Sequence, residues 1–226
     1  MIMKKYDLAV FDLDGTLLDT SDGVLAAVRY TIEKMGFAPL PEATLATFIG
    51  PPVQDSFARA YGLSGPILQT IANVFRTQYA TVDLLKAKAY PGIYDLFERL
   101  AAAGVKTAVA TYKREDYALS LLRAFGFDRY TDLMHGADNE NKLKKRDIIE
   151  LCIRESGVTD RARVVMVGDT AHDAKGAAEI GVDFIGVTFG FGFRTETDVD
   201  LYPNVGCADA PLDILRPIGV PHGGTT

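Results

Sequence analysis

Short apolar runs alternate along most of this chain with longer segments of helical periodicity. Four runs are short and bounded by polar residues or glycine: 6–11, which is mostly apolar, and 105–111, 162–170 and 182–188, which are rich in β-branched residues. Three segments between them place apolar residues three and four positions apart: 93–104, 115–126 and 145–157. The first pattern is typical of buried strands and the second of amphipathic helices. Strands that alternate with single helices indicate βαβ crossovers. We therefore predict an α/β fold, with a doubly wound parallel sheet as its Rossmann-like core.

One long segment interrupts this alternation. It shows helical patterns at 22–36, 53–61 and 65–80 but no convincing strand. A helical insertion that is joined twice to a sheet is well situated to act as a lid. We predict that residues 1–19 and 86–226 form the catalytic core and that residues 20–85 form an inserted α-helical cap domain.

Composition narrows the classes of partner and compartment. The 226 residues carry a net charge of −6, which opposes nonspecific binding to nucleic acid or anionic lipid. Cys152 and Cys207 stand far apart without neighbouring Cys or His, so neither a zinc site nor a disulfide framework is indicated. No segment approaches the roughly 20 apolar residues of a membrane span. We expect a cytoplasmic protein with no nucleic acid and no membrane as partner.

Acidic residues follow two of the predicted strands. Asp12 and Asp14 come directly after the first strand, and Asp169 stands at the end of the run 162–170, with Asp173 just beyond it. Ligands of open parallel sheets collect at the carboxyl ends of strands, so these carboxylates belong at one edge. Each pair alone has a simpler interpretation, as an Asx turn or as a helix N-terminus with Asp173 in its first turn. Together they favour a Mg²⁺ site in which Asp12, Asp169 and the backbone carbonyl of Asp14 are ligands.

A phosphate group is the natural ligand for such a site. Thr111 ends the run 105–111, and it offers a hydroxyl and nearby N–H groups at the start of the next helix. Lys142, Lys144 and Lys145 lie at the start of the helix predicted near 143–156. A lysine cluster is usually solvated, but one lysine that reaches inward would neutralise phosphate and carboxylate together.

These residues resemble the four motifs of the haloacid dehalogenase-like hydrolase superfamily. The matches are DLDGT at 12–16, Thr111, a lysine near 145 and GDTxxD at 168–173. They stand in the family's order and extend over the whole chain. Within the subclass that carries an α-helical cap, the chain most resembles phosphoglycolate phosphatase-like proteins, because FIGPPVQDSF at 48–57 and GVTFGFG at 186–192 are similar to two of their loops.

The resemblance implies a phosphatase and a role for each motif residue. Asp12 would be the nucleophile that forms an aspartyl-phosphate, and Asp14 the general acid and base. Thr111 and Lys145 would bind the phosphate of a small-molecule ester, with Lys142 as the alternative lysine. Four residues would serve the Mg²⁺ site: Asp12, Asp14, Asp169 and Asp173, the last as a ligand or as an orienting residue.

Two positions near the motifs are less typical. After Thr111 the family often has Ser or Asn, whereas this chain has Tyr112; its N–H can bind phosphate, and its larger phenol would narrow the pocket. His172, inside the fourth motif, is expected to face solvent.

The resemblance leaves several activities open. A phosphomutase of the β-phosphoglucomutase type has the same four motifs, and a nucleotidase or a pyrophosphatase of the superfamily is a further alternative. A dehalogenase is disfavoured by the acid at position 14, and a catalytically idle binding protein is disfavoured by the intact set of motifs. The sequence does not identify the ester or the oligomeric state.

Overall fold

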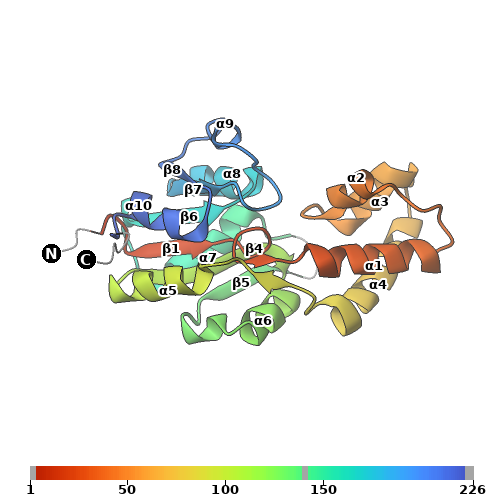
Figure 1. The fold of residues 1–226 in the computed structure, drawn as a ribbon, viewed down its shortest axis with the longest axis horizontal. Coiled ribbons are helices and arrows are strands. Elements are labelled where there is room, and N and C mark those ends of the chain that lie inside the picture. Colours follow the sequence, from red (N-terminus) through yellow and green to blue (C-terminus); the bar gives the residue numbers. More distant parts are fainter. Residues whose placement is uncertain (1–3, 139–141, 222–226) are drawn as a thin grey trace. The chain divides into compact units, whose positions relative to one another are not determined.

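The computed structural model describes residues 4–138 and 142–221 of the chain. It divides into two compact units, Met1–Leu18 with Ala89–Thr226 and Asp19–Lys88 (Figure 1). Among the described residues, no helix is both long enough and apolar enough to cross a membrane.

The larger unit is built on a six-stranded sheet in the order β5-β4-β1-β6-β7-β8. All of its strand pairs are parallel. The strands are β1 (Leu8–Phe11), β4 (Lys106–Arg114), β5 (Met134–Ala137), β6 (Val164–Gly168), β7 (Asp183–Val187) and β8 (Gly206–Ala208). The α/β fold with a doubly wound parallel sheet is therefore confirmed. Strands β5 and β8 were not predicted from the sequence.

Helices cover both faces of this sheet (Figure 1). They are α5 (Ile93–Ala102), α6 (Glu115–Ala124), α7 (Lys145–Ser156), α8 (Ala171–Ile180), and the shorter α9 (Glu196–Val199) and α10 (Leu215–Ile218). Alternate residues of β1 show how the layers form. Leu8 and Val10 pack into one apolar cluster with Ile148 of α7, whereas the ring of Phe11 lies 5.0 Å from that of Phe97 on α5. Because successive strand residues point to opposite faces, β1 is buried from both sides.

Strand β1 lies where the order of the sheet reverses. The chain first adds β4 and β5 on one side of β1, and then crosses over to add β6, β7 and β8 on the other. Phe11, the last residue of β1, is in register with Val109 of β4 and Val167 of β6. The residues that follow these three positions therefore meet at one edge of the sheet, at the switch point where open α/β sheets bind ligands.

The smaller unit is helical. It contains α1 (Ser21–Lys34), α2 (Glu42–Leu45), α3 (Val53–Tyr61) and α4 (Ile67–Gln78), and α4 continues into one π-helical turn at Tyr79–Asp83. Six buried residues form its apolar core: Val28, Ile32, Leu45, Phe48, Phe57 and Ile71. The three helical patterns read from the sequence correspond to α1, α3 and α4. The short strands β2 (Leu18–Asp19) and β3 (Lys88–Ala89), which pair with each other, lie in the two segments that join the units.

Within the helical unit, Gly23 of α1 allows an unusually close approach of backbone. A Cβ atom at this position would overlap the carbonyl oxygen of Asp83 and would lie 3.0 Å from that of Lys86. Asp83 is itself buried, and its carboxylate accepts a hydrogen bond from Gln78 at 2.9 Å. The first turn of α1 and the end of the π-helical turn are therefore packed against each other without an intervening side chain.

Candidate active site

Asp12 is the first residue after β1, and its side chain is held by a lysine from another element. The N–H of Asp12 donates to the carbonyl of Val167 at 2.9 Å, which extends the β1–β6 pairing by one residue. Its Oδ1 accepts a hydrogen bond from Nζ of Lys145 at 2.6 Å. Lys145 opens helix α7 and is only 3% exposed, and Asp12 is 7% exposed. This ion pair is therefore almost completely removed from water.

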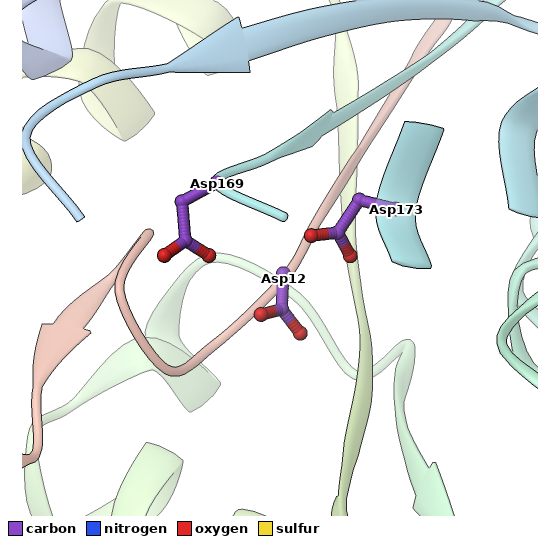
Figure 2. A group of neighbouring side chains, drawn as sticks. All are labelled: Asp12, Asp169 and Asp173. Atoms are coloured by element: carbon purple, nitrogen blue, oxygen red, sulfur yellow. The ribbon is translucent and has the colours of Figure 1, made fainter. Parts of the chain in front are cut away.

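Asp169 occupies the matching position after β6. Its Oδ2 accepts hydrogen bonds from the backbone N–H groups of Phe191 at 2.7 Å and Gly192 at 3.0 Å. Its Oδ1 is buried and has no hydrogen-bond partner. Such an oxygen is costly unless something else meets it. Figure 2 shows that this carboxylate and those of Asp12 and Asp173 converge from three different segments.

Asp173 has two roles, one for each carboxylate oxygen. Its Oδ2 accepts from the N–H of Thr170 at 3.0 Å and from the Thr170 hydroxyl at 2.7 Å, so it closes a capping box at the start of α8. Its Oδ1 lies 2.7 Å from Nζ of Lys145, in an ion pair that is not a well-aligned hydrogen bond. The helix-cap interpretation of GDTxxD is thus confirmed, and the same carboxylate also contacts Lys145 of the candidate site.

Glycines make room for these carboxylates. A Cβ atom at Gly15 would overlap Asp169 Oδ2, and one at Gly168 would overlap the carboxyl group of Asp173. A Cβ atom at Gly190 would overlap both the Gly15 carbonyl and Asp169. Gly15 also has φ +82°, a conformation that L side chains rarely adopt. The loop after β7 can therefore wrap around Asp169 because side chains are missing at these positions.

Burial perturbs the ionisation of the cluster. It raises the pKa of Asp12 to about 6, although Lys145 acts in the opposite direction. It raises the pKa of Asp169 to about 8, and the nearby charge of Asp173 adds to that effect. Burial alone would lower the pKa of Lys145, but Asp12 and Asp173 outweigh it and hold the pKa above its usual range. Three buried carboxylates therefore lie together with one ammonium, which contacts two of them, Asp12 and Asp173.

This arrangement fits a divalent cation. Asp12, Asp169 and Asp173 each offer a carboxylate oxygen, and these oxygens lie within 4.8 Å of one another. The unpartnered Oδ1 of Asp169 is an oxygen ligand of the kind that Mg²⁺ prefers. Asp173 fits less well as a direct ligand, because Thr170 and Lys145 already engage its two oxygens.

The side chain of Asp14 is not one of these three carboxylates, although its charge contributes to the raised pKa of Asp12. Its Oδ1 lies 3.1 Å from Nζ of Lys113, and the two side chains are 21% and 9% exposed. The backbone around it forms a tight loop, in which the N–H of Gly15 donates to the carbonyl of Leu18 at 2.9 Å. Asp12 and Asp14, two residues apart, therefore have different cationic partners.

The surroundings of Thr111 differ from the expectation in one respect. Strand β4 continues to Arg114, and α6 begins only at Glu115, so Thr111 does not stand at a helix start. Its pairing with β5 is irregular between Ala110 and Arg114, beyond the last position that β4 shares with β1. The buried hydroxyl of Thr111 accepts a hydrogen bond from the N–H of Lys113 at 3.1 Å. Its hydrogen is thereby left to donate elsewhere.

The three lysines of the 142–145 segment differ clearly in burial and in their contacts. Lys145 reaches Asp12 and Asp173, whereas the side chains of Lys142 and Lys144 are exposed. Tyr112 is 40% exposed. Its ring lies under Nζ of Lys145, with 5.9 Å between that atom and the ring centroid.

Sequence reasoning missed Lys113 and the amide contacts of the 190–192 loop. Lys113 could have been found, because residues two apart on a strand share a face and Thr111 was already singled out. The strand was predicted to end at residue 111, so Lys113 was not recognised as lying on the same strand face as Thr111. The amide contacts to Asp169 carry no side-chain signal at all, since any residue supplies an N–H.

Comparison with known proteins gives a consistent picture. The family model described as haloacid dehalogenase-like hydrolase matches residues 9–187. A 5'-nucleotidase of Pseudomonas aeruginosa is 32% identical over 219 residues, which cover 96% of this chain and 97% of that protein. A phosphoglycolate phosphatase of Agrobacterium fabrum is 33% identical and is covered to 86%, with 88% of this chain matched. Among solved structures, a haloacid dehalogenase-like family hydrolase from Streptococcus pneumoniae has a TM-score of 0.85 at 28% identity, covering 94% of this chain and 98% of that chain.

Proposed function

Because this chain belongs to the haloacid dehalogenase-like hydrolases, we propose that it is a Mg²⁺-dependent phosphatase that hydrolyses a small phosphate monoester through an aspartyl-phosphate on Asp12. The observation that carries the proposal is the buried contact between Asp12 and Lys145. It places a carboxylate nucleophile beside a fixed cation, at the edge of the sheet where ligands bind.

The proposed metal site uses Asp12, Asp169 and the backbone carbonyl of Asp14, and its support is the unpartnered buried oxygen of Asp169. Asp173 would serve mainly to hold Lys145 in place. When bound, Mg²⁺ would offset the negative charge that the carboxylates and the phosphate bring together.

The chain's own residues would divide the remaining work. The hydroxyl of Thr111 donates to a phosphate oxygen, and Lys145 neutralises the phosphate and Asp12 together. Asp12 attacks phosphorus in line while Asp14 donates a proton to the leaving oxygen, which frees the alcohol. A water molecule then attacks the aspartyl-phosphate and gives a proton to Asp14, so phosphate leaves and both carboxylates return to their first state.

The relatives support a small, soluble substrate. They are named as a 5'-nucleotidase and a phosphoglycolate phosphatase, and we propose a phosphate ester of this size range as the partner of the site, in the cytoplasm. Residues 20–85 are proposed as the cap that controls access of the substrate.

The proposal is tested with a panel of phosphate esters, namely phosphoglycolate, nucleoside monophosphates, sugar phosphates and phosphotyrosine, and with the anhydride pyrophosphate. Phosphate release should stop with a chelator and return with Mg²⁺. Asp169→Asn should lose most of the activity at saturating Mg²⁺. Chelator-resistant turnover by metal-free protein would contradict the role of the metal. Phosphoryl transfer between positions of a sugar, with little phosphate released, would instead favour the phosphomutase alternative.

A further inference from the structure

Two exposed aromatic side chains border the proposed phosphate site. Tyr112 follows Thr111 on β4, and His172 lies in the first turn of α8, directly before Asp173. Their ring centroids are 5.4 Å apart and their planes meet at 85°. His172 does face solvent, as expected, but one side of its ring is in contact with Tyr112. Strand β4 therefore supplies both Thr111 and the Tyr112 ring, and helix α8 supplies both Asp173 and the His172 ring.

The pair fixes the direction of the Tyr112 ring. An edge-to-face contact is a favoured geometry for two aromatic rings, and here it restrains a side chain that is 40% exposed. Lys145 Nζ lies over the face of the same ring, 5.9 Å from the centroid. Because that ammonium also bonds Asp12, the face of Tyr112 borders the space in which the proposed phosphoryl group lies.

A leaving group attached to that phosphoryl group would reach this face within its first few atoms. A phosphate that accepts a hydrogen bond of about 2.8 Å from Lys145 would be held by an ammonium that lies 5.9 Å from the centroid of the Tyr112 ring. A flat ring on the ester oxygen can stack on Tyr112, whereas a small alkyl group covers little of it. The face of an aromatic ring can stack on planar groups of different chemical types.

Resting on the phosphatase function proposed above, we propose that Tyr112 and His172 form a recognition surface for aromatic leaving groups. The substrate class that this surface favours is the aryl phosphates, in which the ring is bonded directly to the ester oxygen. Tyr112 supplies the stacking face, and His172 acts as a positioning residue that holds the Tyr112 ring in place.

Binding of two phosphonates tests the proposal without turnover. Benzylphosphonate and ethylphosphonate replace the ester oxygen with carbon, so they mimic an aryl and a small alkyl phosphate that cannot be hydrolysed. Calorimetry with the full chain and Mg²⁺ should show benzylphosphonate binding about three- to tenfold more tightly, the range expected for one aromatic contact. Tyr112→Phe should keep this ratio, Tyr112→Asn should bring it close to one, and His172→Ala should lower it in part.

A matched control comes from Tyr117 on α6, whose ring packs on the guanidinium of Arg114 instead, at 3.9 Å. Tyr117→Asn should leave the ratio unchanged. A wild-type ratio near one, or a ratio that survives in both Tyr112→Asn and His172→Ala, would overturn the aromatic surface. Inorganic phosphate separates the two proposals: if the wild-type protein binds no phosphate in the presence of Mg²⁺, the proposed function itself fails.

Discussion

Lys113 and Asp14 form an ion pair of 3.1 Å, so the two carboxylates of the Asp12-Leu13-Asp14 sequence have different ammonium partners. Asp12 bonds Lys145 and is almost fully buried, whereas the Asp14 side chain is 21% exposed. Residues of one chemical type thus stand in two environments, as is typical where carboxylates take separate roles.

Asp12→Asn and Asp14→Asn should fail in different ways. Asparagine at 12 removes the anionic nucleophile, so no covalent intermediate should form. Asparagine at 14 keeps the nucleophile but removes the proton donor and the later base. With an activated aryl phosphate, a phosphoryl adduct should therefore accumulate on Asp12 of the Asp14→Asn protein, visible as a mass increase after acid quenching. An adduct in Asp12→Asn, or one that maps to another residue, would overturn the assignment of the nucleophile.

Lys145→Met should be far more damaging than Lys144→Met. The first substitution removes the ammonium that Asp12 and Asp173 share, and turnover should fall about 100-fold or more. It also leaves buried charge uncompensated, which costs about 3–5 kcal/mol of unfolding free energy in metal-free protein. Lys144 is exposed, and its substitution should change turnover less than twofold. Phosphate release and denaturant unfolding measure the two effects, and equal losses in both variants would contradict the placement of Lys145.

The stability of metal-free protein should fall as pH rises from 5 to 9. Burial raises the pKa of Asp12 to about 6 and of Asp169 to about 8, well above the value of about 4 in an unfolded chain. Between these values the folded protein holds protons that the unfolded chain has released. The contribution of Asp12 and Asp169 to the free energy of unfolding is therefore complete below about pH 4. It is lost as pH rises through the pKa values that the two carboxyl groups have in the folded protein.

Thermal unfolding with and without Mg²⁺ measures this effect. Mg²⁺ should raise the melting temperature most at the higher pH, because it binds the ionised carboxylates. Asp169→Asn should flatten the pH dependence of the metal-free protein and weaken the response to Mg²⁺. A melting temperature that rises between pH 6 and pH 8 without metal, in both proteins, would show that these carboxylates are not the source.

Gly23→Ala should destabilise the helical unit, although alanine normally has a higher helix propensity than glycine. Alanine is favoured over glycine inside a helix by about 1 kcal/mol. Here the new methyl group would overlap the carbonyl oxygen of Asp83, and backbone cannot move aside as a side-chain tip does. Glu33, exposed in the same helix, provides the reference: Glu33→Ala should be more stable than Glu33→Gly. Denaturant unfolding of all three variants gives the signs, and a Gly23→Ala protein more stable than wild type would contradict the close packing.

Much of the fold could be predicted because buried strands leave a strong apolar signal. The four runs read from the sequence correspond to β1, β4, β6 and β7, all inside the sheet. Strand β5 has the sequence Met-His-Gly-Ala and lies at the sheet edge; it is as long as β1 but lacks a continuous run of large apolar residues. Strand β8, at the other edge, is three residues long. Edge strands need only one neighbour, and their sequences are correspondingly less constrained.

The candidate site likewise contains residues that could be predicted from the sequence and residues that could not. Side chains that come directly after central strands, such as Asp12 and Asp169, could be found from strand endings alone. The choice of Lys145 over Lys142 depended on the register of α7, which periodicity does not determine within a run of lysines. The Lys113–Asp14 pair required the true end of β4, and strand boundaries are the least certain part of such a reading.

The glycines around the carboxylates have a consequence for natural variation in this protein. Gly168 and Gly190 carry no reactive group, yet a single methyl group at either would occupy the volume of Asp173 or Asp169. Such a replacement leaves net charge, polarity and every catalytic group unchanged in the sequence. Variants of this kind would be classed as conservative in a genome and would nevertheless force Asp173 or Asp169 to move, so the sterically intolerant part of the site is larger than its chemically recognisable part.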